Sequence, residues 1–412
     1  MQKLQCEVCG SVNIIRTDDG MFQCENCGCK YTLDRIRSML PERIVLTAPE
    51  FKVIAGTLLK YEGESVEIEI PEGVMKISMG VFSGMSNLRR VVFPSTLTYI
   101  GDKAFYKCTN LEELIFRNNI VSLGKEAFSG CIRLPAVILN GGIVGMAKYA
   151  FEGCRSLRTV SLSKQIRAIS EGVFKGCSSL QDQNGQLLPK SIQSIGPKAF
   201  MECRSLGRLV LPDTLSTIGA SAFSDCASLR MIQFTNRGSL QSIQERAFYG
   251  CISLQGIGIP GSLRELGDEA FFGCTSLTSV SIPGSLRKIG IQTFANCVRL
   301  ECVMIMPGVE EIARGAFFNC QTLKRIDLPD TVQKIDEFSF WECSNLSEIY
   351  HSPIYGASRF RKTKYADSLQ RGRCCCCDGI ILLGRCIKCG KRYGYVDGQY
   401  GYVDGQLYLL RQ

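Results

Sequence analysis

The sequence predicts a solenoid of short parallel strands, and three observations lead to this fold class. A phenylalanine returns every 23 residues from Phe82 to Phe340, and only two of the eleven intervals differ, at 26 and 25 residues. A leucine follows each of these twelve phenylalanines after six residues, and an aliphatic residue follows eleven of them after nine. A fixed period of roughly 20–50 residues is typical of repeat proteins, whose units bury their apolar faces only against one another.

Each unit contains one predicted strand. Apolar residues nine and eleven positions after the phenylalanine commonly flank a polar one, as in Val280-Ser281-Ile282, which is the period of a half-buried strand. A proline such as Pro283 often follows and is expected to end the strand, because it has no N–H for the ladder. A pair such as Ile289-Gly290 is then expected to turn the chain, since glycine accepts the backbone angles of a tight corner.

Two units depart from the pattern. The fifth unit reads LQDQNGQLLPKSI, with a three-residue insertion and a glutamine where the core needs an aliphatic residue. We expect a bulge or kink there. The seventh unit is also longer and carries Asn236-Arg237 in an extra loop.

A cysteine follows the phenylalanine after three residues in eleven of the twelve units, and Met85 takes its place in the first. One interpretation is a redox or metal ladder. The other is a small buried thiol whose S–H donates to a turn carbonyl. We favour the buried thiol, because no histidine or carboxylate recurs in register with the cysteines.

The repeat resembles that of a known family. Residues 270–290 read AFFGCTSLTSVSIPGSLRKIG, which is similar to the BspA-like, or Treponema-type, leucine-rich repeat. The resemblance extends from about Phe51 to Tyr350, and residues 51–77 resemble the entry hairpin and cap repeat of the family. It implies an α/β repeat solenoid, a right-handed coil whose parallel β-sheet lies on the concave side and contacts proteins. We therefore expect a leucine-rich repeat domain over residues 44–350, with a cap and about twelve repeats.

The N-terminus carries two Cys-x-x-Cys knuckles, at Cys6 and Cys9 and, fourteen residues later, at Cys24 and Cys27. This spacing is typical of a tetrahedral zinc site. It predicts a zinc-ribbon-like domain over residues 1–40 that ends in a short helix after Thr32. A segment of this size cannot build a sufficient core, so the predicted role of the zinc is structural.

The C-terminus carries a second, more closely spaced pair of knuckles. The predicted zinc ligands there are Cys374, Cys377, Cys386 and Cys389, although Cys375 and Cys376 make the first knuckle ambiguous. A redox dithiol is the alternative. We expect a basic linker at 351–373 and a short zinc-ribbon-like module at 374–412. Within this module the segment GYVDGQ occurs twice, and its Asp-Gly pairs favour hairpin turns without indicating a function.

The net charge of +9 is concentrated near the C-terminus, where residues 351–412 carry 11 basic and 4 acidic side chains. Two zinc sites of four thiolates each would lower the net charge of the chain to about +5. A basic run that includes Phe360 and Tyr365 could touch nucleic acid, but we favour a solvated linker.

The cysteine content, the hydropathy and the scarcity of histidine bear on the cellular compartment and on possible catalysis. The chain has 23 cysteines, no signal peptide and no apolar run long enough to span a membrane, so the sequence favours the reducing cytoplasm. The only histidine, His351, lies where the repeats end, and no phosphate-binding loop occurs. We therefore expect neither an enzyme nor a small-molecule substrate.

These observations favour a scaffold that binds proteins on the concave face. The outward positions are seven, eight and ten residues after each phenylalanine, and mixed charges there suggest a protein partner rather than a polyanion. The predicted contact residues are Arg89, Arg90, Glu112, Glu113, Arg158, Arg208, Arg230, Lys324, Arg325 and Asp327. A nucleic-acid-associated protein and a cell-surface adhesin remain as alternatives.

Overall fold

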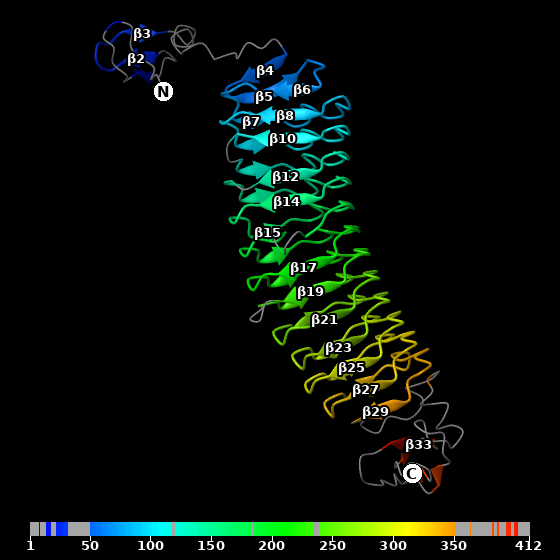
Figure 1. Cartoon of the computed structure of the whole chain (residues 1–412). Helices are drawn as coiled ribbons and strands as arrows, with labels where there is room; N and C mark the ends of the chain where they lie inside the picture. The colour runs from blue at the N-terminus through cyan, green and yellow to red at the C-terminus, as the bar shows by residue number, and fades with distance from the viewer. Residues whose placement is uncertain are drawn as a thin grey trace.

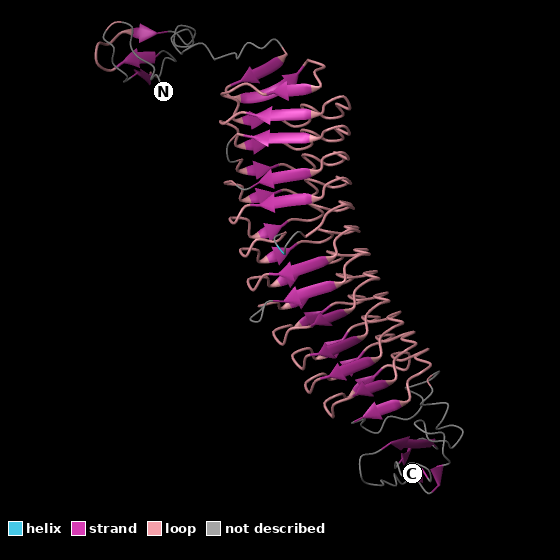
Figure 2. Ribbon diagram, viewed as in Figure 1, coloured by secondary structure: helices cyan, strands magenta, loops and turns pink. Residues whose placement is uncertain are grey.

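The computed structural model describes residues 8, 14–17, 22–31, 50–117, 120–139, 141–182, 185, 187–234, 239–350, 363, 381–382, 385–386, 393–396 and 399–402. Residues 50–350 form an elongated, curved solenoid of stacked coils (Figure 1). The described residues contain strands and turns but no α-helix (Figure 2), so the predicted α/β character is wrong for them. The helix expected after Thr32 lies outside the described residues.

In every coil except the fifth, one described strand lies at the predicted position, and these strands form what we call the long-strand face. They are β6 (Glu67–Glu69), β8 (Arg90–Phe93), β10 (Glu113–Phe116), β12 (Ala136–Leu139), β14 (Thr159–Leu162), β17 (Arg208–Leu211), β19 (Met231–Phe234), β21 (Gly256–Gly258), β23 (Ser279–Ile282), β25 (Cys302–Ile305), β27 (Arg325–Asp327) and β29 (Glu348–Tyr350). Adjacent strands pair in parallel, as in Val280↔Val303. The placement of this face on the concave side stays a prediction.

A second set of strands ends at the apolar residue before the corner, which in half of these strands is the first residue of an Ile-Gly or Leu-Gly pair, where the sequence predicted only a turn. These short strands are β7 (Lys76–Ile77), β9 (Tyr99–Ile100), β11 (Ser122–Leu123), β13 (Gly145–Met146), β15 (Ala168–Ile169), β16 (Ser194–Ile195), β18 (Thr217–Ile218), β20 (Ser242–Ile243), β22 (Glu265–Leu266), β24 (Lys288–Ile289), β26 (Glu311–Ile312) and β28 (Lys334–Ile335). They also pair in parallel and form the short-strand face. At the N-terminal end, β4 (Phe51–Ile54) and β5 (Thr57–Tyr61) form the expected antiparallel hairpin.

The glycine of the pair has a different role from the one predicted. Gly101 has no left-handed backbone angle, but an added Cβ would come within 2.6 Å of the Ile77 carbonyl oxygen in the preceding coil. Gly219 is equally close to the Pro197 nitrogen, at 2.6 Å. Glycine is present because neighbouring backbones approach closely, which a side chain would prevent.

Neither sheet is continuous. The long strands form three groups, β6–β8–β10, β12–β14 and β17 to β29. The second break falls at the fifth unit, where the described residues between β14 and β17 include the two short strands β15 and β16 but no long one. The bulge or kink expected there falls partly on residues 183–184 and 186, which lie outside the described residues, and it stays a prediction. Asn236 and Arg237, in the seventh unit, lie outside the described residues.

The third side of each coil is a turn corner centred on the repeating phenylalanine. In most coils the residues two before and two after it have positive φ, as do Lys103 (53°) and Lys107 (55°) around Phe105. These angles direct alternate N–H groups toward the next coil, so that Phe105 N–H donates to Ala127 O over 2.8 Å. The corner thus carries its own ladder of hydrogen bonds between coils, which takes the place of a helix.

The core is a column of stacked rings. The twelve phenylalanines pack one on the next with centroids 4.8–5.8 Å apart and planes within 22° of parallel. All of them are fully buried. Such pairs add about 0.5–1.5 kcal/mol each beyond the burial of their area.

The repeated cysteines run beside this column. Each of the eleven Sγ atoms donates to the carbonyl oxygen of the phenylalanine one coil earlier, as Cys108 does to Phe82 over 3.0 Å. All eleven are buried. The structure confirms the interpretation of the cysteines as buried thiols that cap turn carbonyls.

Candidate functional site

The long-strand face positions the outward side chains. In most strands buried core residues alternate with outward ones, as in β23, where Val280 and Ile282 are buried and Ser279 and Ser281 are exposed. Successive coils therefore present successive outward residues in rows about 4.8 Å apart. Each predicted contact residue lies on a long strand or immediately before one.

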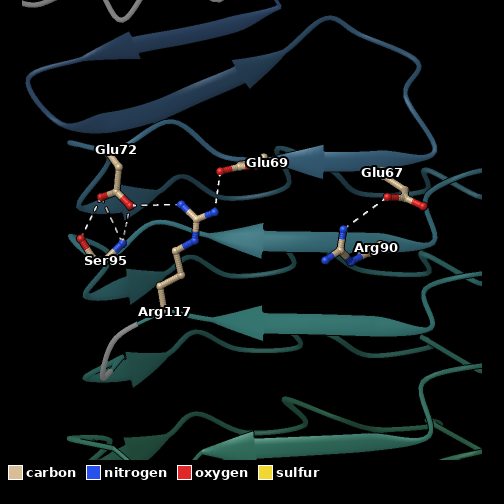
Figure 3. A network of polar contacts seen from close by, with 6 residues as sticks. All are labelled: Glu67, Glu69, Glu72, Arg90, Ser95 and Arg117. Carbon is tan, nitrogen blue, oxygen red and sulfur yellow. Dashed lines mark hydrogen bonds and ion pairs between the residues drawn. The ribbon is translucent and has the colours of Figure 1, made fainter.

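The N-terminal half of the face carries charges that pair with each other (Figure 3). Arg90 on β8 contacts Glu113 on β10 over 2.8 Å and Glu67 on β6 over 3.4 Å. Arg117, which follows β10, reaches back across two coils to Glu69 over 2.6 Å. All these side chains are partly or largely exposed, so each pair adds at most about 1 kcal/mol.

Glu72 closes the other end of this network. Its carboxylate accepts hydrogen bonds from the N–H and the hydroxyl of Ser95, at 3.1 and 2.9 Å, and lies 3.6 Å from Arg117. The bond from the Ser95 N–H, followed by that from the hydroxyl, lowers the pKa of Glu72. These charges are largely satisfied within the solenoid, so a partner would have to displace internal pairs to use them.

Six of the ten predicted contact residues make such internal contacts. Besides Arg90 and Glu113, Glu112 pairs with Arg133 over 3.4 Å, Arg208 donates to Gln233 over 2.5 Å, and Arg325 pairs with Asp327 over 3.1 Å. The other four are the exposed cations Arg89, Arg158, Arg230 and Lys324. The described part of the solenoid gives the side chains of these four no ion pair or hydrogen bond, and they remain available to a partner.

The C-terminal half of the face is different, and the contact residues predicted from the sequence miss it because they were chosen by charge. Met231 on β19 is 54% exposed and Met304 on β25 is 44% exposed. Between them, nothing lies within 4 Å of a Cβ added at Gly256 or Gly258 on β21. Exposed methionines thus border a strip of bare backbone. Exposed methionine is typical of binding surfaces that adapt to a partner, and this could have served as the signal.

The N-terminal metal motif is described only in part. Cys24 ends β2 (Phe22–Cys24), and Cys27 lies in the turn to β3 (Lys30–Tyr31) of a small antiparallel sheet with β1 (Ile14–Arg16). Gly28 has a φ of +76°, and its N–H donates to Cys24 O over 2.9 Å. This tight turn fits a thiolate knuckle. Cys6 and Cys9 lie outside the described residues.

The C-terminal motif is described even less. Cys386 ends β31 (Arg385–Cys386), which pairs with β30 (Ile381–Leu382) as an antiparallel hairpin. The other three predicted ligands, Cys374, Cys377 and Cys389, lie outside the described residues. The part of the chain that the structure describes contains no group of three or more potential metal ligands.

The duplicated segment forms a hairpin of its own. β32 (Tyr393–Val396) pairs with β33 (Gln399–Tyr402), and Val396 faces Gln399. The hairpin is therefore present, while the Asp-Gly pair of the first copy, which was expected to turn it, lies outside the described residues. The second Asp-Gly pair and His351 lie outside the described residues.

The described segments include no helix that is long and apolar enough to cross a membrane.

Comparison with known proteins gives a family match and several structural likenesses. The model for the BspA type leucine rich repeat region matches residues 54–181, 186–297 and 264–355. No curated protein matches the chain.

Several solved structures share parts of this architecture. A leucine rich cell surface protein from Faecalibacterium prausnitzii is 26% identical over 74% of this chain and 92% of its own, with a TM-score of 0.48. A leucine-rich repeat protein from Bacteroides ovatus is 23% identical over 74% and 96%, with a TM-score of 0.39. The pneumococcal vaccine antigen PcpA is 16% identical over 86% and 100%, with a TM-score of 0.45.

Proposed function

The chain belongs to the family of BspA type leucine-rich repeat proteins, and from this premise we propose that it is a non-enzymatic scaffold that binds a protein partner on its long-strand face. One observation carries the proposal. On the C-terminal half of this face, Met231 and Met304 expose apolar side chains on either side of the bare backbone at Gly256 and Gly258. When a partner covers exposed apolar surface on a regular sheet, the burial of that surface stabilises the complex.

The exposed cations place charged groups next to this strip. Arg230 immediately precedes β19 and Lys324 immediately precedes β27, four coils further on. At the equivalent position before the long strand β25, between the coils of these two cations, the residue is Glu301 and carries a carboxylate. A protein surface with an apolar centre and carboxylates at its rim therefore complements the strip. Rim charges of this kind raise the association rate more than the affinity.

A photo-crosslinking residue placed at Met304 tests this surface in cells. We expect it to form protein adducts, and we expect the same residue at Val144 to form none. Val144 is a matched control because it is 56% exposed but lies on the short-strand side, next to Gly145 of β13. Adducts at Val144 but not at Met304 would move the contact to the other face, and adducts at neither position would refute the scaffold function.

A second test uses substitutions of equal charge. Met231→Glu with Met304→Glu should abolish recovery of the crosslinked partner, because two buried carboxylates would face the apolar centre of the contact. Val121→Glu with Val144→Glu adds the same charge to the short-strand side and should leave recovery unchanged. Equal loss in both double variants would point to a general charge effect.

The same proposal includes structural zinc at the ends of the chain. The tight turn between Cys24 and Cys27, with left-handed Gly28, supports a knuckle at the N-terminus. Cys6 and Cys9 would complete that site, and Cys374, Cys377, Cys386 and Cys389 would form the other. Bound zinc would supply folding energy to segments that are too short for a core. Elemental analysis should find two zinc ions per chain, and Cys24→Ser with Cys27→Ser should remove one.

We also propose that the chain works in the cytoplasm, where thiols stay reduced. The eleven buried cysteines of the solenoid support this location, because each must keep its S–H to donate to a carbonyl. Cell fractionation checks the proposal. Recovery on the cell surface would support an adhesin instead.

A further inference from the structure

A cavity of about 1140 Å³ opens at the irregular fifth unit beside the end of β14. Ser161, Ser163, Lys164, Gln165, Lys190 and Ser191 supply the polar side chains of its described lining. This lining contains two ammonium groups, three hydroxyls and one amide, but no carboxylate. A concave site with a few converging polar groups of one charge sign is typical of a small-ligand pocket.

The two lysines lack the pairing with an opposite charge that many charged side chains of the solenoid have. Elsewhere a charged side chain often faces the opposite charge one coil away, as Arg246 faces Glu269 over 2.9 Å and Lys175 faces Glu152 over 2.9 Å. Such pairing is expected because coils about 4.8 Å apart bring equivalent side chains side by side.

Lys164 and Lys190 occupy equivalent positions in successive coils, each four residues before the pair that aligns β15 with β16. Two positive charges therefore lie side by side. Among the described residues neither lysine has an ion pair or a side-chain hydrogen bond, and Asp213, at this position in the next coil, is not part of the described lining. An unneutralised pair of cations attracts an anion.

Ser163 adds a second, independent feature. It stands where regular units such as the first have a strand-ending proline, Pro94. Its side chain is only 2% exposed, and its Oγ accepts the Gln165 N–H over 3.1 Å. No described acceptor takes its hydroxyl proton. A buried donor without an acceptor is costly in free energy, and a ligand oxygen would satisfy it.

We propose that this cavity binds a small phosphate ester that carries hydroxyl groups, such as a sugar phosphate. The ammonium groups of Lys164 and Lys190 hold the phosphate through charge-assisted hydrogen bonds. The hydroxyl of Ser163 donates to a ligand oxygen, and Ser161 and Gln165 contact the hydroxyl groups of the ligand. The site is separate from the strip between Met231 and Met304, so it does not depend on the proposed function.

Isothermal titration with three probes tests the site on the full chain: glucose 6-phosphate, inorganic phosphate and glucose. We expect the ester to bind most tightly, inorganic phosphate about tenfold more weakly, and glucose not measurably. Higher salt should weaken the binding of the ester. Glucose binding as tightly as its phosphate ester, or no binding of either phosphate, would overturn the proposal.

Substitutions locate the binding. Lys164→Gln with Lys190→Gln should weaken the ester at least about tenfold. Lys52→Gln with Lys76→Gln removes the same charge from exposed positions outside the described lining, and it should leave the affinity unchanged. Equal weakening in both double variants would mean attraction by net charge alone and would refute the site.

The variant Ser163→Ala tests whether the buried hydroxyl contacts the ligand. It should weaken the ester severalfold while the melting temperature stays close to that of the original chain, since the variant removes a donor that has no described acceptor. Unchanged affinity would exclude the buried hydroxyl from the site.

Discussion

The aromatic and thiol column and the long-strand face are built by the same repeat but differ in kind. In the column every coil places a phenylalanine ring on the next at 4.8–5.8 Å, and the cysteines cap the turn carbonyls in the same way throughout. On the face, paired charges at Arg90 give way to exposed methionines at Met231 and Met304. Each residue of the column must pack against both neighbouring coils, whereas an outward residue need only be compatible with an extended backbone. The repeated residues therefore stabilise the fold, and recognition depends on the outward residues that differ from coil to coil.

The largest expected effect is on the column and follows from pH. Burial raises the pKa of Cys108, Cys154 and Cys297 from 9.0 to about 12, and it raises the pKa of seven more repeated cysteines. Below pH 9 the thiols are protonated in both states and stability is complete. Between pH 9 and 12 only the unfolded state loses the protons, so stability falls.

Each thiol contributes up to about 1.4 kcal/mol per pH unit in this window, so ten thiols give a slope on the order of 14 kcal/mol per unit. Urea unfolding at pH 8, 9 and 10 measures it. Cys203→Ala with Cys226→Ala should make the slope shallower by two protons. An unfolding midpoint that does not change between pH 8 and 10 would contradict the buried thiol ladder.

Removing one ring from the column should have the next largest effect. Phe200 lies between Phe174 and Phe223, with centroids 5.4 and 5.2 Å away. Phe200→Ala leaves a cavity in the stack and should cost about 3–5 kcal/mol of unfolding free energy. The control is Phe272→Ala on the turn corner, where a partly exposed ring contacts Tyr249 at 4.9 Å and its loss should cost about 1–2 kcal/mol. Equal costs at both positions would remove the distinction between column and surface.

A glycine between coils gives the third effect. A Cβ added at Gly284 would collide with the Pro307 carbonyl oxygen of the next coil, so Gly284→Ala should cost about 3 kcal/mol. On the long-strand face, Gly258 has nothing within 4 Å of an added Cβ, and Gly258→Ala should leave the midpoint of thermal unfolding nearly unchanged. A large decrease in the unfolding midpoint of Gly258→Ala would show that other atoms fill the space above this backbone.

The smallest effect is expected from the paired charges of the face. Arg90→Gln removes the contacts with Glu67 and Glu113, and it should cost less than about 1 kcal/mol, because these side chains are 40–66% exposed. Chemical unfolding at low and at high salt checks this, since salt should reduce the difference between the two proteins. A cost above about 2 kcal/mol would mean that the pairs belong to the structural core.

Much of the fold could be read from the repeat because its period reports a steric requirement. Phe105, Cys108 and Leu111 recur together since each contacts its equivalents in the neighbouring coils, and their burial followed from their spacing. The family and the capping role of the thiols are confirmed for the same reason. The zinc sites, the cytoplasmic location and the absence of catalysis stay predictions.

The rest depended on relations between coils that no single unit displays. The pair at Ile100-Gly101 predicted a turn, but Tyr99 and Ile100 form a strand, because parallel pairing with the next coil satisfies their backbone. The family resemblance implied an α/β solenoid, yet left-handed residues such as Lys103 build a ladder of hydrogen bonds at the turn corner in place of a helix. The contact residues were chosen by charge, and six of the ten proved to be engaged within the chain.

The sequence by itself determined the repeat, its register and the residues of the column, because burial and ring stacking impose the same choice in every unit. Only the tertiary structure decided which outward charges neutralise one another and which remain exposed. It also revealed that Lys164 and Lys190 lie side by side over a cavity. These contacts depend on the tertiary structure because residues 23–26 positions apart in the chain become neighbours in space only when the coils stack.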